Sequence, residues 1–101
     1  MATNFDLKFS NSFYQDFSDI ISYIQNELKN IVAAENLIEK VDIAINKRLK
    51  NPKDFQVFLT PHHNEYYKIY INNYVIFYTV TDTTMIVRRM IYSKRNNDEL
   101  F

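Results

Sequence analysis

The chain has 101 residues, 47% of them hydrophobic and 16% aromatic, with a formal net charge of zero and with no cysteine and no glycine. That length predicts one domain over residues 1–101 with a single core. The composition excludes disulfides, thiolate metal sites and glycine-rich phosphate loops. A secretory signal and the roughly 20 apolar residues of a membrane helix are both missing from the sequence, so we expect a cytoplasmic protein.

The neutral total conceals an uneven distribution of charge. Residues 1–46 contain three Lys against seven Asp and Glu, a net charge of −4, and residues 47–101 contain nine Lys and Arg against five Asp and Glu, a net of +4. Such asymmetry indicates a basic surface on one side of a neutral molecule. A basic surface fits a nucleic-acid partner, and it equally fits a solvated face that binds none.

The N-terminal part predicts a short strand followed by a helix. Residues 5–9 (FDLKF) alternate apolar and polar side chains, which is typical of a strand. A helix follows to about Leu28, and Ser12 with Gln15 has the spacing of a capping box near its start. Apolar residues recur every three or four positions along this helix, which predicts one core-facing side with Asp16 away from it.

A second helix is predicted from about Val32 to Leu49, because its apolar residues keep the same helical spacing. Its last turn is basic, with Lys47, Arg48 and Lys50, and positive charge there complements the helix dipole. An Asn-Pro pair then ends the helix, since the residue before proline avoids helical backbone. The short connection between the two helices predicts an antiparallel hairpin.

Residues 51–65 are predicted to form a loop, with Phe55–Leu59 as its one short strand. His62 and His63 lie in this loop. Adjacent histidines can bind a metal ion, but nothing else in the sequence completes a ligand set. We therefore expect two exposed loop histidines and no metal site.

The rest of the chain is organised around Tyr66–Tyr92, which predicts three consecutive antiparallel strands. This stretch holds six of the eight tyrosines together with many isoleucines and valines, residues that suit a pleated sheet. Asn72-Asn73 and Asp82-Thr83 interrupt the apolar runs, and Asn and Asp tolerate the left-handed backbone of tight turns. No acidic residue occurs between positions 83 and 97, so the last strand leads into a basic run.

Strand alternation places Arg88 and Arg89 on opposite faces of the last strand. Simple alternation also puts Ile86 and Met90 with Arg88, and Met85, Val87 and Ile91 with Arg89. Both sets are apolar, so the sequence leaves open which arginine faces the helices.

The order of strand, helix hairpin and three-stranded antiparallel meander defines an α+β fold. Together with NYVIFYTVTD followed by IVRRMIYSKR, this order resembles the RelE/ParE family of toxins from bacterial type II toxin–antitoxin modules. Tyr74 and Tyr78 match aromatic positions of that family and Asp82 matches its acidic turn. The last strand and the segment after it also match, at Arg89, Met90, Ile91, Tyr92, Lys94 and Arg95.

The chain departs from the family pattern at several positions. Val75 stands where many members have Arg, and Tyr67 stands near another common Arg, with Lys68 beside it on the opposite face. Tyr92 replaces the usual His. Many members are strongly basic, whereas this chain is neutral.

The resemblance implies a ribonuclease that cleaves messenger RNA on the ribosome without a metal or other cofactor. Arg89 and Tyr92 are the predicted catalytic residues, with Tyr92 as stacking platform or as acid and base. Arginine suits a phosphate because its planar fork donates two parallel hydrogen bonds. The predicted substrate-binding residues are Lys68, Arg88, Lys94 and Arg95.

Other readings of the same features remain open. The basic strand also fits a surface that a cognate antitoxin covers, and Tyr92 also fits the rim of a small core. The missing arginines and the neutral charge favour a ParE-like inhibitor of DNA gyrase, and an inactive member that only binds its antitoxin is a third reading. The ribonuclease is the preferred function, with the antitoxin and ribosome-bound messenger RNA as partners and no membrane.

Overall fold

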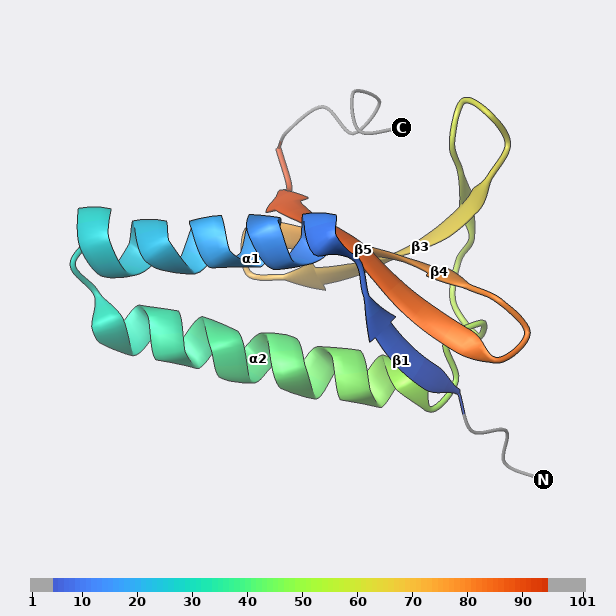
Figure 1. The fold of residues 1–101 in the computed structure, drawn as a ribbon, viewed down its shortest axis with the longest axis horizontal. Helices are drawn as coiled ribbons and strands as arrows, with labels where there is room; N and C mark the ends of the chain where they lie inside the picture. Colours follow the sequence, from blue (N-terminus) through green and yellow to red (C-terminus); the bar gives the residue numbers. More distant parts are fainter. Residues whose placement is uncertain (1–4, 95–101) are drawn as a thin grey trace.

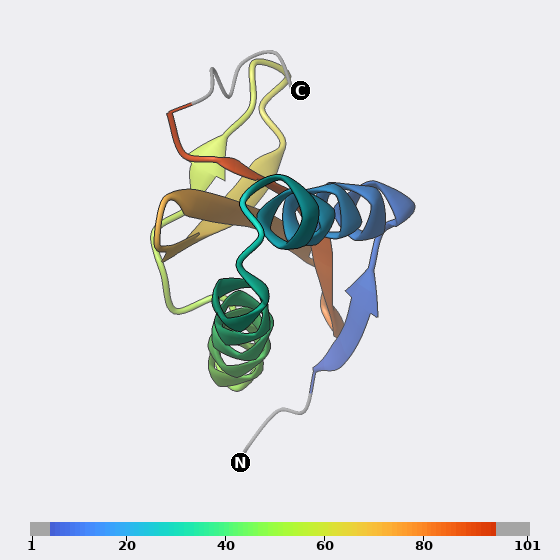
Figure 2. The same cartoon turned by 90° about the vertical axis from the view of Figure 1, so that its left-hand side faces the viewer.

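The computed structural model describes residues 5–94 and contains a five-stranded sheet beside two long helices (Figure 1). Its elements in chain order are strand β1 (Asp6–Phe9), helix α1 (Asn11–Ser22), the π-helical segment η1 (Tyr23–Glu27), helix α2 (Ile31–Leu49), and strands β2 (Phe58–Leu59), β3 (Glu65–Ile71), β4 (Tyr74–Val80) and β5 (Thr84–Tyr92). The helices run antiparallel, and the end-on view in Figure 2 shows them side by side with β1 at one edge of the sheet.

The predicted α+β order of an N-terminal strand, a helix pair and antiparallel strands is confirmed. The predicted meander is present as β3, β4 and β5, but the sheet is larger than a meander, with strand order β1-β5-β4-β3-β2. Strand β1 joins β5 in parallel, from Asp6 opposite Thr84 to Phe9 opposite Val87. The predicted strand at Phe55–Leu59 shrinks to β2, which pairs with the start of β3.

Helix α1 begins two residues earlier than the predicted capping box implies. Ser10 is the N-cap, and its Oγ accepts a hydrogen bond from the Phe13 N–H at 3.1 Å. Ser10 is already fixed where β1 ends, because its own N–H donates to the Val87 carbonyl at 2.9 Å. The predicted capping box at Ser12 and Gln15 was therefore wrong, because the pairing of β1 with β5 brings Ser10 to the N-cap position.

The main core lies between the helices and one face of the sheet. Its fully buried sheet residues include Ile76, Tyr78, Met85 and Val87. The apolar sides of both helices complete it, with Phe13, Ile24, Ala34, Leu37, Val41 and Ile45 buried. A smaller buried cluster occupies the opposite face of the sheet and consists of Tyr66, Val75, Phe77 and Ile91.

A β-bulge in β5 decides which face each arginine occupies. Phe77 pairs with Arg89 but the next residue, Tyr78, pairs with Val87, so Arg88 is the extra residue. Beyond the bulge Met90 rejoins the main core, whereas Ile91 belongs to the smaller cluster on the other face. The prediction that Arg88 and Arg89 lie on opposite faces, with Met90 beside Arg88, was therefore wrong, because the extra residue shifts the period of the strand. Ile91 does share the face of Arg89, as predicted.

Tyr78 ties the end of α2 to the sheet. Its hydroxyl donates to the Pro52 carbonyl at 2.8 Å and accepts from Arg48 Nη1 at 3.0 Å. Arg48 also donates to the Lys68 carbonyl at 3.1 Å and stacks over the Phe55 ring at 3.6 Å. Burial is the main cause that raises the pKa of Tyr78, although the hydrogen bond from Arg48 opposes it. This tyrosine is a structural anchor.

We expect Tyr78→Phe to lower the free energy of unfolding by about 1–3 kcal/mol, because it leaves buried polar partners without their hydrogen bonds. Tyr70→Phe is the matched control, since Tyr70 is 65% exposed. Urea unfolding followed by circular dichroism measures both variants. Equal stability of the two variants would contradict the anchoring role.

Candidate functional site

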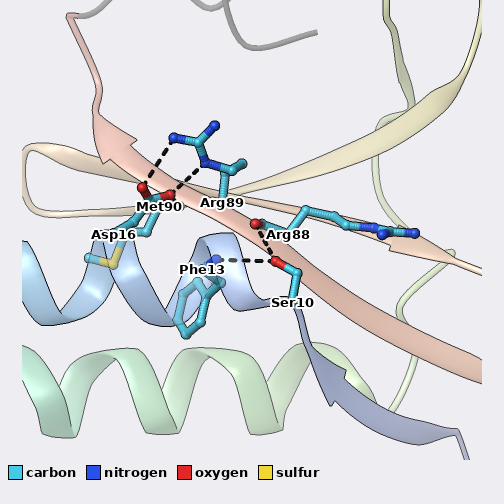
Figure 3. Close-up of polar contacts among 6 residues, drawn as sticks. All are labelled: Ser10, Phe13, Asp16, Arg88, Arg89 and Met90. Atoms are coloured by element: carbon cyan, nitrogen blue, oxygen red, sulfur yellow. Dashed lines mark hydrogen bonds and ion pairs between the residues drawn. The ribbon is translucent and has the colours of Figure 1, made fainter.

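Arg89 is bound to helix α1 through Asp16. Its Nε donates to Asp16 Oδ2 at 2.6 Å and its Nη2 to Oδ1 at 3.1 Å, as Figure 3 shows. The hydrogen bond to Asp16 is the main cause that raises the pKa of Arg89, with burial acting against it. The sequence placed Asp16 only away from the apolar side of the helix, and in the structure α1 turns this position toward the edge of β5.

The same carboxylate closes the exposed edge of β5. Strand β1 pairs only with the first half of β5, as far as Val87. Farther along, the Met90 N–H donates to Asp16 Oδ2 at 3.0 Å. Asp16 therefore satisfies a backbone donor that would otherwise lie unpaired on an edge strand, and it fixes Arg89 at the same time.

Arg88 lies at the bulge and has a different environment from Arg89. Its carbonyl accepts from Ser10 Oγ at 2.6 Å, and its Nε donates to Thr79 Oγ1 at 3.0 Å. Figure 3 shows its side chain extended along the strands, away from the Asp16 pair. Within residues 5–94 Arg88 makes no ion pair, so its guanidinium remains available to an anionic ligand.

Lys68 shares the sheet face that carries the smaller cluster. The strand register aligns Lys68, Phe77 and Arg89 across three neighbouring strands. The ammonium of Lys68 lies 4.2 Å from the centroid of the Phe58 ring and 5.9 Å from that of Phe77. Cation–π contacts of this kind hold the lysine beside the apolar cluster while its charge still faces this side of the sheet.

Tyr92 lies on the other side of the sheet from Lys68. Its ring meets the Tyr74 ring edge-on at a centroid distance of 6.1 Å, and Tyr74 packs against the main core on the helix side. Burial is the main cause that raises the pKa of Tyr74, followed by Tyr23 and Tyr92. Tyr92 is 47% exposed, so its ring remains accessible at the end of β5.

The structure therefore gathers some of the predicted site residues and separates others. Lys68, Arg88 and Arg89 share one face of the sheet, and Tyr92 lies on the opposite one. Lys94 is exposed two residues beyond β5, and Arg95 lies outside the described residues. The catalytic and substrate-binding roles of these residues stay predictions.

An open polar groove of about 750 Å³ crosses the same face. One wall is the β2–β3 connection, which projects away from the helices in Figure 1, and the other is formed by β5 and the start of α1. The described residues that line it are Ser10, Ser12, Thr60, His62, His63, Asn64, Glu65, Tyr66, Thr79, Val80, Thr81, Arg88 and Arg89.

The two histidines in this groove were expected only as exposed loop residues. They are exposed, but the pairing of β2 with β3 places them on the same groove as Arg88. No local pattern in the sequence predicts this, because the two parts of the groove are far apart in the chain. Among residues 5–94, no three His, Asp or Glu side chains are placed to hold a metal ion together.

Comparison with known proteins places the chain in a family. The family model described as the ParE toxin of the type II toxin–antitoxin system, parDE, matches residues 7–97. The chain belongs to this toxin family. No curated protein sequence matches the chain.

Three solved structures share the fold of this family member. A copper-bound mutant toxin from Helicobacter pylori has a TM-score of 0.56 at 19% identity, covering 96% of this chain and 99% of that one. A conserved hypothetical protein from the same organism gives 0.55 at 19% identity, with the same coverage of 96% and 99%. YafQ from E. coli gives 0.54 at 17% identity, covering 96% and 98%. Identities this low show the fold alone.

Neither helix in the described part of this toxin-family chain is long and apolar enough to cross a membrane.

We expect Asp16→Asn to lower the free energy of unfolding by about 1–3 kcal/mol, because the side chains of the ion pair are only 16% and 26% exposed. Asp19→Asn is the control on the same helix. Asp19 is exposed and accepts one hydrogen bond from Gln15 at 2.8 Å, so its substitution is expected to cost less than about 0.5 kcal/mol. Chemical denaturation gives both values, and a control as destabilised as Asp16→Asn would argue against the assigned role.

Proposed function

We propose that this toxin blocks translation as a metal-independent, ribosome-dependent endoribonuclease that cleaves messenger RNA. The observation that carries the proposal is the position of Lys68, Arg88 and Arg89 on the sheet face opposite the two helices. Cationic side chains aligned over neighbouring strands suit a polyanion that lies across the sheet. The net charge of +4 on residues 47–101 also favours an anionic partner.

Cleavage of RNA without a metal needs cations at the phosphate and groups that move protons. In the proposal Lys68 and Arg88 contact phosphates of the message, and Arg89 adds its charge through Nη1, the nitrogen that does not bind Asp16. Lys94 and Arg95 extend the cationic run beyond β5. Tyr92, exposed at the end of that strand, stacks on a base or exchanges a proton with the ribose 2′-hydroxyl.

The proposed partner of the free toxin is a cognate antitoxin, in keeping with its type II family. An antitoxin segment that covers the cationic sheet face would neutralise its charge and block access to RNA. This mode of inhibition needs no change in the fold of the toxin. The place of action of such a pair is the cytoplasm, as the sequence predicts.

A ParE-like inhibitor of DNA gyrase is the second candidate, and a specific observation favours it. Two nitrogens of Arg89 are engaged by Asp16, and Tyr92 lies across the sheet from Lys68. The predicted catalytic residues are thus not gathered around one point. A toxin that binds gyrase needs a shaped surface and no catalytic set, and an inactive family member needs only its antitoxin surface.

Induction of the toxin in growing cells separates these candidates. We expect growth arrest, rapid loss of protein synthesis and messages cut within their coding regions, measured by isotope incorporation and by mapping of RNA 5′ ends. Lys68→Ala with Arg88→Ala should abolish the cuts, because the phosphate contacts are lost. Filamentation and a DNA-damage response with intact messages would instead support the gyrase inhibitor.

A further inference from the structure

The polar groove contains one guanidinium whose orientation is fixed and whose charge is not compensated. Thr79 accepts from Arg88 Nε at 3.0 Å, so the planar end of the side chain is held in one direction. Its two terminal nitrogens have no partner within residues 5–94. An oriented guanidinium fork of this kind binds the oxygens of a phosphate with two parallel hydrogen bonds.

The facing wall of the groove presents two histidines on a well-fixed turn. Thr60 is buried, and its Oγ accepts from the N–H of His62 at 3.3 Å and of Asn64 at 3.1 Å. The His63 N–H donates to the Thr60 carbonyl at 2.9 Å. His63 adopts a φ of 64°, a left-handed conformation that is uncommon outside glycine but that histidine adopts more readily than most residues.

The charges around the groove favour an anion. Glu65 is the one described lining residue that carries a carboxylate, and the charge of Arg89 is already paired with Asp16. Arg88 remains as a cation, and the two imidazoles can add hydrogen-bond donors. The groove, at about 750 Å³, is far larger than one phosphate ion and matches the size of sites that hold nucleotide-sized ligands.

We propose that this groove holds a nucleotide of single-stranded RNA, with Arg88 on its phosphate and His62 and His63 as donors from the opposite wall. The inference rests on the proposed RNA target and adds a binding site on the β2–β3 connection, away from Tyr92. It also gives a function to the bulge in β5. The extra residue turns Arg88 out of the regular strand, over Thr79 and into the groove.

The two histidines provide a direct probe, because the chain contains no others. We expect their imidazole C–H resonances in the wild-type protein to move when a 2′-O-methylated RNA oligomer, which cannot be cleaved, is added. Inorganic phosphate should produce much smaller shifts at the same phosphate concentration. Unmoved histidine resonances at saturating RNA would overturn the proposal, and equal shifts with free phosphate or poly-glutamate would overturn the assignment to RNA.

Substitution of Arg88 tests the phosphate contact. Arg88→Gln should weaken binding of the uncleavable RNA about tenfold or more, since a charge-assisted pair contributes about 1.5–3 kcal/mol. Lys53→Gln removes the same charge from an exposed residue outside the groove and should change the affinity less than about twofold. Thermal unfolding of both variants confirms that they remain folded, and Arg88→Lys separates loss of the fork from loss of charge.

Cleavage by the wild-type toxin on ribosomes is measured in parallel. If the wild type cleaves messages and Arg88→Gln binds RNA as tightly as Lys53→Gln does, the groove proposal fails and the proposed function stands. If RNA binding depends on Arg88 but the wild type leaves messages intact, the groove stands and the ribonuclease function fails.

Discussion

One carboxylate, that of Asp16, joins the two halves of this protein. It accepts two hydrogen bonds from the Arg89 guanidinium and one from the Met90 backbone N–H, so a single side chain on α1 engages both the backbone and a side chain of β5. Strand β1 pairs with β5 only as far as Val87. Beyond that point Asp16 accepts the hydrogen bond of the Met90 N–H, which would otherwise be unpaired at the edge of the sheet. This contact adds to the main core and to the hydrogen bonds of Tyr78 in holding the helix hairpin against the sheet.

The ion pair between Asp16 and Arg89 gives two adjacent arginines different environments. Arg89 is bound to the helix, and the bulge turns its neighbour Arg88 over Thr79, where it lines the groove. A regular strand would have sent the two side chains to opposite faces of the sheet. The bulge instead leaves both on the face without helices, Arg89 in an ion pair with Asp16 and Arg88 without an ion pair within residues 5–94.

Much of the fold could be predicted from the sequence, because most helices and strands follow from the local spacing of apolar residues. The apolar spacing of the helices, the tyrosine-rich strands and the Asn72-Asn73 turn, where Asn72 has a φ of 53°, all follow from local chemistry. The parallel pairing of β1 with β5 and the choice of Ser10 as the cap depend on contacts distant in the chain. The bulge at Arg88 could not be predicted for another reason. Both faces of β5 carry apolar side chains, so the pattern of the sequence does not reveal where the alternation shifts.

The candidate site was only partly predictable. The basic residues of the last strand were evident in the sequence. The position of Arg88 and Arg89 on the sheet face opposite Tyr92, and the ion pair of Arg89 with Asp16, were not. His62 and His63 line the groove only because β2 pairs with β3.

The different roles of the two arginines are tested most directly by comparing the unfolding free energies of Arg88→Gln and Arg89→Gln under identical conditions. Loss of the ion pair should make Arg89→Gln less stable by about 1–3 kcal/mol, whereas Arg88→Gln should stay within about 0.5 kcal/mol of the wild type. Equal stability of the two variants, or a larger loss in Arg88→Gln, would contradict the division of roles between these arginines.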